Sequence, residues 1–310
     1  MKSTTVRRVA LSAVVVTTLT GLAACGSQDA GKGDKAVGRS VTHVSPLAAL
    51  LSADKSTDKA ESAKVRSTTS IGDAMSMTAN GALAWGQGLR GNLTITYTGG
   101  QMAEAMRKAG SSSMEARYLP DAYYARMSEK FAQQFGKHWI RYAYDDLAKL
   151  GGSSGAYLKD QLQNTTPNQS VKLLLASGDV KKVGQEKVSG AEATHYSGTV
   201  DVARLAGKNS HLTADQLAGL KKQLSQAGVS TETIDIWVDG QDLLVKKVEK
   251  ADMANGTMTS TAYYSDYGVK VTAEAPPAGD TKDFTDLAKS GGTASSGSQT
   301  SVPGGSGTSS

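Results

Sequence analysis

The chain has 310 residues, of which 39% are hydrophobic and 5% aromatic, and a formal net charge of +5. Removal of the first 24 residues, which contain Lys2, Arg7 and Arg8, would lower that charge to +2. A nearly balanced charge gives no support for binding to nucleic acid. The single cysteine, Cys25, excludes an intrachain disulfide and a metal site built from several cysteines.

The N-terminal segment carries the pattern of a bacterial lipoprotein signal peptide. Basic residues precede an apolar run over 9–22, and the sequence Leu22-Ala23-Ala24-Cys25 follows. We expect signal peptidase to recognise Leu22, Ala23 and Ala24, residues 1–24 to be removed, and Cys25 to carry a diacylglycerol. The apolar run is shorter than the ~20 residues that a membrane-spanning helix needs.

A Cys25-linked diacylglycerol would attach the protein to the cell membrane at its extracytoplasmic face. Two or three acyl chains bind a bilayer firmly, whereas one chain binds it only marginally. Two alternatives stay open at this point. Cys25 is incidental if the segment is an ordinary secretory signal, and the pair Arg7-Arg8 would instead mark twin-arginine export.

Composition divides the remaining chain into three parts. Residues 25–44 are rich in Gly and small polar residues, which predicts a flexible linker after the lipidated cysteine. Residues 289–310 consist almost wholly of Gly, Ser and Thr, which predicts a disordered tail. The stretch 45–288 between them is expected to form a single domain.

The first half of this domain is predicted to be one helix followed by strands. Ser45 and Pro46 suit the start of a helix that ends near residue 63. Alternation of apolar and polar side chains then predicts strands, with a tight turn at Asn80-Gly81. The predicted strands span 65–71, 74–80, 81–85, 92–97 and 138–144, with a hairpin over 112–127.

The second half mixes helices with a β-meander. Apolar spacing predicts helices over 145–150, 155–162, 168–176 and 283–289, and strands over 180–188 and 191–202. Thr213 and Gln216 form a capping box at the start of a further helix. Asp239-Gly240 and Asn255-Gly256 are favoured hairpin turns between the last strands. The fold class is therefore α+β, with about ten strands in a curved antiparallel sheet covered by amphipathic helices.

Several short motifs do not find the context that their chemistry requires. The Gly-x-Gly-x-x-Gly pattern at 86–91 precedes a strand instead of a helix, so we interpret it as a hairpin loop. The Gly-x-Ser-x-Gly pattern at 151–155 lacks the strand and helix of a nucleophile elbow. The four histidines show no ligand spacing, and His195 is interpreted as a hydrogen-bonded strand residue. We therefore predict no catalytic residue, metal or cofactor; a hydrolase using Ser153 or His195 is a distant alternative.

Residues 183–201 resemble the central signature of the LppX/LprG-type actinobacterial lipoproteins. The resemblance lies in Val-Gly-Gln-Glu-Lys-Val-Ser-Gly-Ala and, after two residues, Thr-His-Tyr-Ser-Gly-Thr-Val-Asp. Residues 236–239, 267–271 and Pro276-Pro277 resemble the closing strands of that family. The resemblance implies a LolA/LolB-like half-barrel closed by helices around an apolar cavity. It also implies a non-catalytic protein that binds or carries a lipid or lipoglycan in the cell envelope.

The strands offer suitable side chains for lining such a cavity, although either sheet face could be the inward one. The candidate lining residues are Met75, Met77, Leu83, Leu93 and Ile95. The leading hypothesis is a membrane-anchored, monomeric carrier of a lipid or another apolar small molecule. The alternative is a cell-surface interaction or sensing module with the same fold and a filled core.

Overall fold

The computed structural model describes residues 45–150, 159, 162, 166–205, 214–226, 228–253 and 256–291. The predicted signal peptide, Cys25 and the linker therefore lie outside the described residues. So do the Gly-x-Ser-x-Gly pattern, most of the helix predicted over 155–162, the capping residue Thr213, and residues 292–310 of the predicted tail.

Twelve strands of the described chain form one open sheet, in the order β12-β6-β5-β4-β3-β2-β1-β11-β10-β9-β8-β7. The strands are β1 (Ser62–Ile71), β2 (Met75–Ala84), β3 (Arg90–Gly99), β4 (Ser113–Tyr118), β5 (Ala122–Arg126), β6 (Trp139–Ala143), β7 (Lys181–Val188), β8 (Ala191–Asp201), β9 (Thr231–Asp239), β10 (Leu244–Met253), β11 (Gly256–Ser265) and β12 (Thr281–Asp283). Neighbouring strands are antiparallel except for β12, which pairs with β6 in parallel. The predicted α+β class is confirmed, with twelve strands where about ten were expected.

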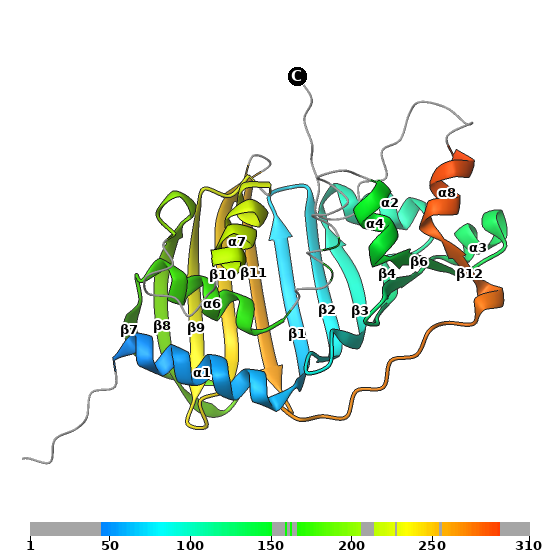
Figure 1. The fold of residues 1–310 in the computed structure, drawn as a ribbon. Helices are drawn as coiled ribbons and strands as arrows, with labels where there is room; N and C mark the ends of the chain where they lie inside the picture. The colour runs from blue at the N-terminus through cyan, green and yellow to red at the C-terminus, as the bar shows by residue number, and fades with distance from the viewer. Residues whose placement is uncertain are drawn as a thin grey trace, which may run out of the picture. The chain divides into compact units, whose positions relative to one another are not determined.

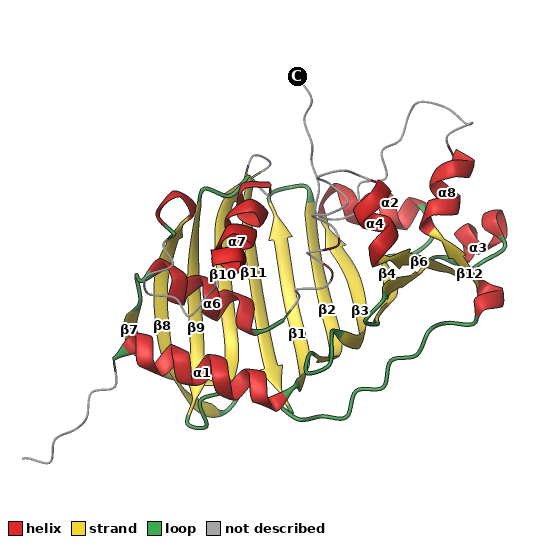
Figure 2. Ribbon diagram, in the orientation of Figure 1, coloured by secondary structure: helices red, strands yellow, loops and turns green. Residues whose placement is uncertain are grey.

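The helices lie mainly along one face of this sheet, which we call the inner face (Figures 1 and 2). They are α1 (Pro46–Ala60), α2 (Gly100–Lys108), α3 (Glu129–Phe135), α4 (Tyr144–Leu150), α6 (Asn168–Ser177), α7 (Ala214–Gln226) and α8 (Phe284–Gly291). Helices α1 and α6 pack on each other and over β8–β10, whereas α2 packs on β2 and β3. Helices α4 and α8 pack beside β6. The inner face is thus covered by two separate groups of helices.

Strand register determines which side chains belong to the inner face. Val65 pairs with Gly81 and Tyr264, and Gly81 pairs with Leu93, so these residues share one face across four strands. Because side chains alternate along a strand, the remaining inner positions follow at every second residue. One large core cluster joins these positions to Leu50 of α1 and Leu174 of α6, which are both completely buried.

The predicted turn at Asn80-Gly81 is wrong. Both residues lie within β2, which continues to Ala84 and pairs along its length with β1 and β3. Gly81 is needed for close packing, because a Cβ built there would lie 2.0 Å from the backbone oxygen of Asn92. The hydrogen-bonded ladders on both sides therefore outweigh the local turn preference of the Asn-Gly pair.

Other differences concern short elements. The structure adds α2, α3 and β12, which no sequence pattern predicted. The link between β9 and β10 is also longer than a two-residue turn. Within it, the carboxylate of Asp239 accepts hydrogen bonds from the amides of Gln241 and Leu243, both at 2.9 Å. The Gly-rich segment 86–91 does connect two strands, as expected for a hairpin loop.

A buried hydrogen-bond group fixes α1 on the sheet. The hydroxyl oxygen of Thr57 accepts from the amide of Leu244 at 3.2 Å, and both residues are completely buried. The hydroxyl of Tyr267 donates to the carbonyl of Leu244. These contacts satisfy both backbone groups of Leu244 at the start of β10, where a bulge interrupts pairing with β9.

We expect Thr57→Val to lower the free energy of unfolding by about 1–3 kcal/mol, because it leaves the buried amide of Leu244 without its acceptor. Urea unfolding followed by circular dichroism measures the change. Thr68→Val is the matched control on the exposed outer side of β1, and its effect should stay within about 0.5 kcal/mol. Equal effects of the two substitutions would contradict this role for Thr57.

Candidate functional site

The five candidate lining residues all lie on the inner face. Met75, Leu83, Leu93 and Ile95 are buried, and Met77 is half-buried. They come from β2 and β3, next to α2. The structure therefore brings the predicted set together and places it on the side that the helices cover.

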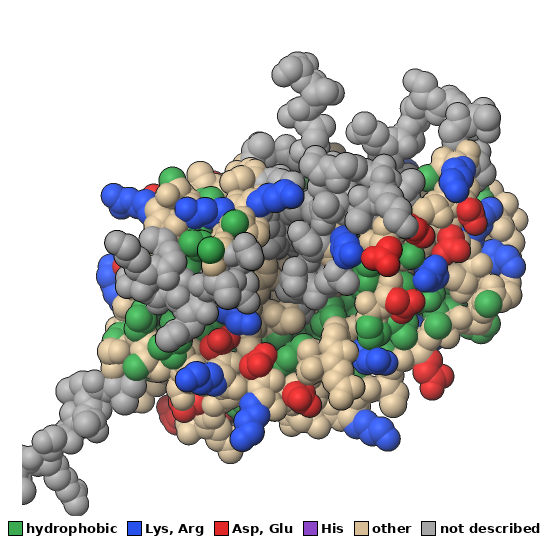
Figure 3. Space-filling view, in the orientation of Figure 1, with side chains coloured by type: hydrophobic (Ala, Val, Ile, Leu, Met, Phe, Trp, Pro, Cys, Tyr) green, Lys and Arg blue, Asp and Glu red, His purple; other side chains and the backbone are tan. Residues whose placement is uncertain are grey.

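Methionines gather around this part of the inner face. Met102 and Met106 of α2 join Met75 and Met77, and Met114 of β4 lies opposite Ile95. All of them except Met75 are only partly buried. Figure 3 shows hydrophobic side chains gathered over β3 and β4 beside α4. Methionine is flexible and adapts to irregular apolar shapes, so this lining suits a surface that must fit more than one partner shape.

Five tyrosines extend the same face toward α4 and α8. They are Tyr97 of β3, Tyr118 of β4, Tyr123 of β5, Tyr142 of β6 and Tyr144 at the start of α4. The rings of Tyr118 and Tyr123 lie 5.1 Å apart in an edge-to-face arrangement, and those of Tyr123 and Tyr142 lie 5.7 Å apart. We call the inner side of β2–β6, with α2 and Tyr144, the methionine–tyrosine face.

Burial alters the acidity of these phenols. It raises the pKa of Tyr118 and of Tyr142 to about 12, and proximity to Tyr97 adds to both shifts. The pKa of Tyr123 is also raised well above its usual value, again mainly by burial and then by its tyrosine neighbours. All of these hydroxyls therefore keep their protons at neutral pH and act as uncharged hydrogen-bond donors.

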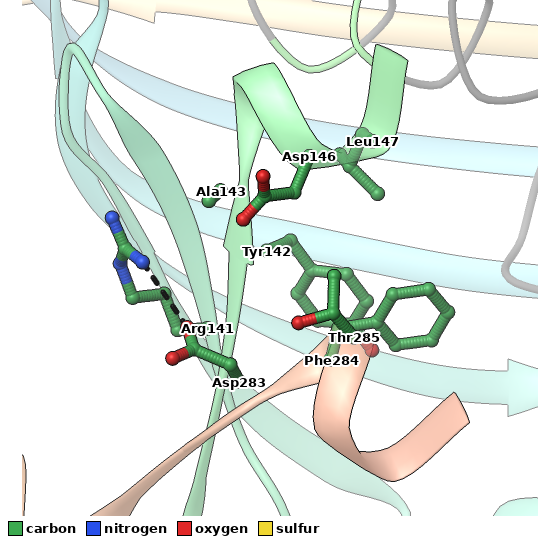
Figure 4. A pocket seen from close by; sticks show the side chains of 8 residues that line it. All are labelled: Arg141, Tyr142, Ala143, Asp146, Leu147, Asp283, Phe284 and Thr285. Atoms are coloured by element: carbon green, nitrogen blue, oxygen red, sulfur yellow. Dashed lines mark hydrogen bonds and ion pairs between the residues drawn. The ribbon is translucent and has the colours of Figure 1, made fainter. Parts of the chain in front are cut away.

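Helix α8 closes the end of the methionine–tyrosine face. Phe284 stacks on Tyr142 with ring centroids 4.9 Å apart. Figure 4 shows this stack beside a narrow hollow between β6, α4 and α8 that has no room for a water molecule. Arg141 bonds Asp283 at 3.1 Å on the other side of β6 and so holds β12 in place. The hollow is an edge feature of the face and is not a ligand-sized cavity by itself.

The other half of the inner face, under α1 and α6, has a different chemistry. Its apolar side chains are mainly branched and completely buried, as in an ordinary core. They include Leu50, Val171, Leu174, Val200, Ile234, Ile236 and Leu244. No candidate lining residue lies in this half, which we call the filled half.

A buried polar cluster borders the filled half. The ammonium of Lys247 lies 3.0 Å from the carboxylate of Glu249 and donates to the hydroxyl of Ser170 at 2.7 Å. Burial alone would lower the pKa of Lys247, but Glu249 outweighs it and the pKa is raised. A protonated lysine cannot act as a base toward Ser170, and Ser170 is completely buried. The Ser–Lys contact therefore lacks the features of a catalytic dyad.

Glu232 lies on the same face as this cluster, opposite Ala251 and Val200. It is 4% exposed. Burial and the neighbouring carboxylate of Glu249 raise its pKa to about 8, and Lys247 offsets only part of the shift. The carboxyl group of Glu232 is thus protonated and uncharged below about pH 8. Sequence analysis missed it, although its spacing of two from Ile234 marks it as an inner-face position.

The outer face of the sheet carries His195. Its ring stacks on Trp237 at 4.1 Å, and its Nε2 lies 2.8 Å from the carboxylate of Asp235. The interpretation of His195 as a hydrogen-bonded strand residue is confirmed. The ammonium nitrogen of Lys246 lies 3.8 Å from the centroid of the Trp237 ring, so His195 belongs to a packed row of side chains across neighbouring strands.

A shallow hollow of about 270 Å³ next to Asn80 and Arg117 also faces outward.

No helix among the described residues is long and apolar enough to cross a bilayer. The His, Cys, Asp and Glu side chains of the described residues form no group of three or more that could hold a metal ion.

Comparison with known proteins shows close relatives in Streptomyces. A Streptomyces griseus protein of 31.2 kDa, encoded between rplA and rplJ, is 58% identical over 254 residues, which cover 81% of this chain and 83% of that protein. A Streptomyces coelicolor protein named as a candidate lipoprotein is 46% identical over 310 residues, covering 94% of this chain and all of that protein. The chain belongs to the family of these Streptomyces proteins. No family model matches the sequence.

Among solved structures, the lipoprotein LppX of Mycobacterium tuberculosis is similar in fold. It is 14% identical, with a TM-score of 0.46, and the match covers 74% of this chain and 98% of LppX. The methionine–tyrosine face is the candidate site that the geometry of the described residues offers.

We expect Glu232→Gln to stabilise the protein in a pH-dependent way. The folded state keeps the Glu232 proton at pH values where the unfolded chain has released it, so the acid destabilises the fold increasingly as pH rises from about 4.5 to about 8. The gain in unfolding free energy from the substitution should therefore grow by about 4 kcal/mol between pH 4 and pH 8.5.

Chemical unfolding of both proteins across that pH range measures the gain. Glu192→Gln is the control, since its side chain is 70% exposed and pairs with Lys187 at 3.7 Å. That change should alter stability by less than about 0.5 kcal/mol at every pH. A gain from Glu232→Gln that does not vary with pH would show that Glu232 is ionised in the folded protein.

Proposed function

We propose that this protein is a membrane-anchored lipoprotein that binds a lipid or another apolar small molecule on its methionine–tyrosine face and carries it in the cell envelope without chemical change. The observation that carries the proposal is the contrast between the two halves of the inner face. One half is packed with buried Leu, Ile and Val, and the other is lined by mostly buried Tyr and by Met side chains that, apart from Met75, are only partly buried.

The apolar side chains of this face supply the binding energy that an acyl ligand needs. Each CH₂ group removed from water contributes about 0.8 kcal/mol, and no charged contact is required for it. Met77, Met106 and Met114 are flexible enough to follow an acyl chain in several conformations. A binding role of this kind needs no catalytic group, which agrees with the protonated state of Lys247 beside Ser170.

Anchoring rests on the N-terminal segment. The order of basic residues, apolar run and Leu22-Ala23-Ala24-Cys25 supports removal of residues 1–24 and lipidation of Cys25. The name of the Streptomyces coelicolor relative points the same way. The polar linker 25–44 would then hold the body near the extracytoplasmic face of the membrane, as a monomer.

The ligand is tested by native mass spectrometry of the full chain purified from bacterial membranes. We expect a non-covalent adduct of several hundred daltons that denaturation removes, while acyl chains on Cys25 stay attached. Lipid extraction then identifies the adduct. A chain that stays free of adduct and takes up no fluorescent acyl probe from vesicles would refute carriage and favour the surface-acting module.

Anchoring is tested separately with Cys25→Ala. We expect this variant to incorporate no labelled palmitate and to leave the precursor uncleaved or release the body from the membrane, because no thiol remains to take the diacylglycerol. Ser27→Ala, two residues further on, should be labelled and anchored like the unchanged protein. Palmitate labelling of Cys25→Ala would disprove the proposed lipidation site.

A further inference from the structure

The five tyrosines of the methionine–tyrosine face share an unusual property: their hydroxyls bond no residue in the described part of the chain. Tyr97, Tyr118, Tyr123 and Tyr144 are each more than nine-tenths buried, and the hydroxyl of Tyr144 is wholly enclosed. The fold satisfies a comparable group elsewhere, since the hydroxyl of Tyr267 donates to the carbonyl of Leu244. Among the five, the Tyr144 hydroxyl is both enclosed and without a partner in the described residues.

These hydroxyls converge because of the strand register. Tyr123 lies opposite Tyr118 on one side and Tyr142 on the other, so the three come from adjacent strands at one level of the sheet. Each of the other four tyrosines contributes to the raised pKa of Tyr123, which requires all of them to lie near it. The result is a group of donors held on rigid strands at the end of an apolar lining.

The electrostatic surroundings favour an uncharged partner. The groups that shift the pKa values of these five tyrosines are other tyrosines and, at Tyr144, Asp121, with no Lys or Arg among the described residues that act on them. Arg141 is the nearby cation on β6, and it is bonded to Asp283 at 3.1 Å and to Asp121 at 3.4 Å. An anion moved into such surroundings would lose its hydration without gaining an opposite charge.

Resting on the proposed function, we infer that these tyrosines form a polar subsite that binds the uncharged, oxygen-bearing end of the ligand, such as an ester, and disfavours a carboxylate at that position. An ester carbonyl accepts hydrogen bonds from phenol hydroxyls without bringing a charge into the buried face. The acyl chain extends from there along Met114, Met77 and Met75. The subsite determines specificity, whereas the methionines supply most of the affinity.

The test compares a fluorescent long-chain fatty acid with its methyl ester, which share one acyl chain and differ in charge at neutral pH. Transfer of each probe from vesicles to the full chain gives two dissociation constants. We expect the ester to bind about tenfold more tightly than the acid, since a hydrogen bond lost at a buried site costs roughly that factor.

The double variant Tyr123→Phe/Tyr142→Phe keeps both rings and removes two hydroxyls. We expect it to bind the ester about tenfold more weakly and the acid with unchanged affinity, so the preference disappears. Tyr124→Phe is the matched control on the same strand, because Tyr124 lies on the outer face opposite Arg117. It should keep the full preference.

The outcomes separate this inference from the function on which it rests. Equal binding of acid and ester by the unchanged protein, tighter binding of the acid, or an undiminished preference in the double variant would each overturn the polar subsite alone. Binding of neither probe would overturn the lipid-binding function together with it. The single variant Tyr144→Phe guards against misfolding, because it removes a buried, unpaired hydroxyl and should unfold at the same temperature or higher; its ester preference should still fall.

Discussion

The alternation of side chains across the paired strands determines where every functional group of this protein lies. β1, β2 and β3 are each paired on both sides, so their register cannot shift independently. A shift of one residue would move Met75, Leu93 and Ile95 to the outer face and Thr94 into the core. The same constraint places Glu232 and the tyrosines on the inner face, since each shares the spacing of two with neighbouring core residues.

The inner face then divides according to side-chain shape. Branched residues such as Ile234 of β9 and Leu174 of α6 are completely buried where α6 packs on the sheet, and this burial contributes to stability. Apart from Met75, the methionines at the other end are only partly buried and gain less from any single arrangement. Under the proposed function, this division lets the protein remain folded both with and without an acyl chain. The filled half holds the sheet together while the methionine–tyrosine face adapts.

The sequence predicted the long elements well because alternation and helix caps are local signals. The start of α1 at Pro46 and the hairpin between β4 and β5 were found in this way. Asn80-Gly81 was assigned wrongly because its turn preference is local, whereas the ladders that override it come from β1 and β3. Helix α2 has only nine residues, and β12 has three and pairs with a strand distant in sequence, so neither carries enough local pattern.

The candidate site was predictable only in part. Met75, Met77, Leu83, Leu93 and Ile95 follow from alternation in two strands, but their face could not be chosen without knowing where the helices pack. The tyrosines come from β3 to β6 and α4, and only the register of three strand pairs brings those on the strands together. Glu232 carried a local signal, since it continues the every-second-residue pattern of Ile234 and Ile236, but an acidic residue in that position is usually taken to face solvent.

The polar groups of the inner face are better explained by binding than by folding. A phenylalanine at 144 would fill the same space as tyrosine without burying an unpaired hydroxyl, and such a hydroxyl costs the fold about 1–3 kcal/mol. Lys247 and Glu249 similarly contribute little net stability as a buried pair, because desolvation offsets their attraction. A face selected for stability alone would therefore replace the tyrosine hydroxyls with apolar atoms. Five phenols gathered on the inner face, three of them at one level of the sheet, are the arrangement expected under the proposed function, in which a ligand supplies the missing acceptors.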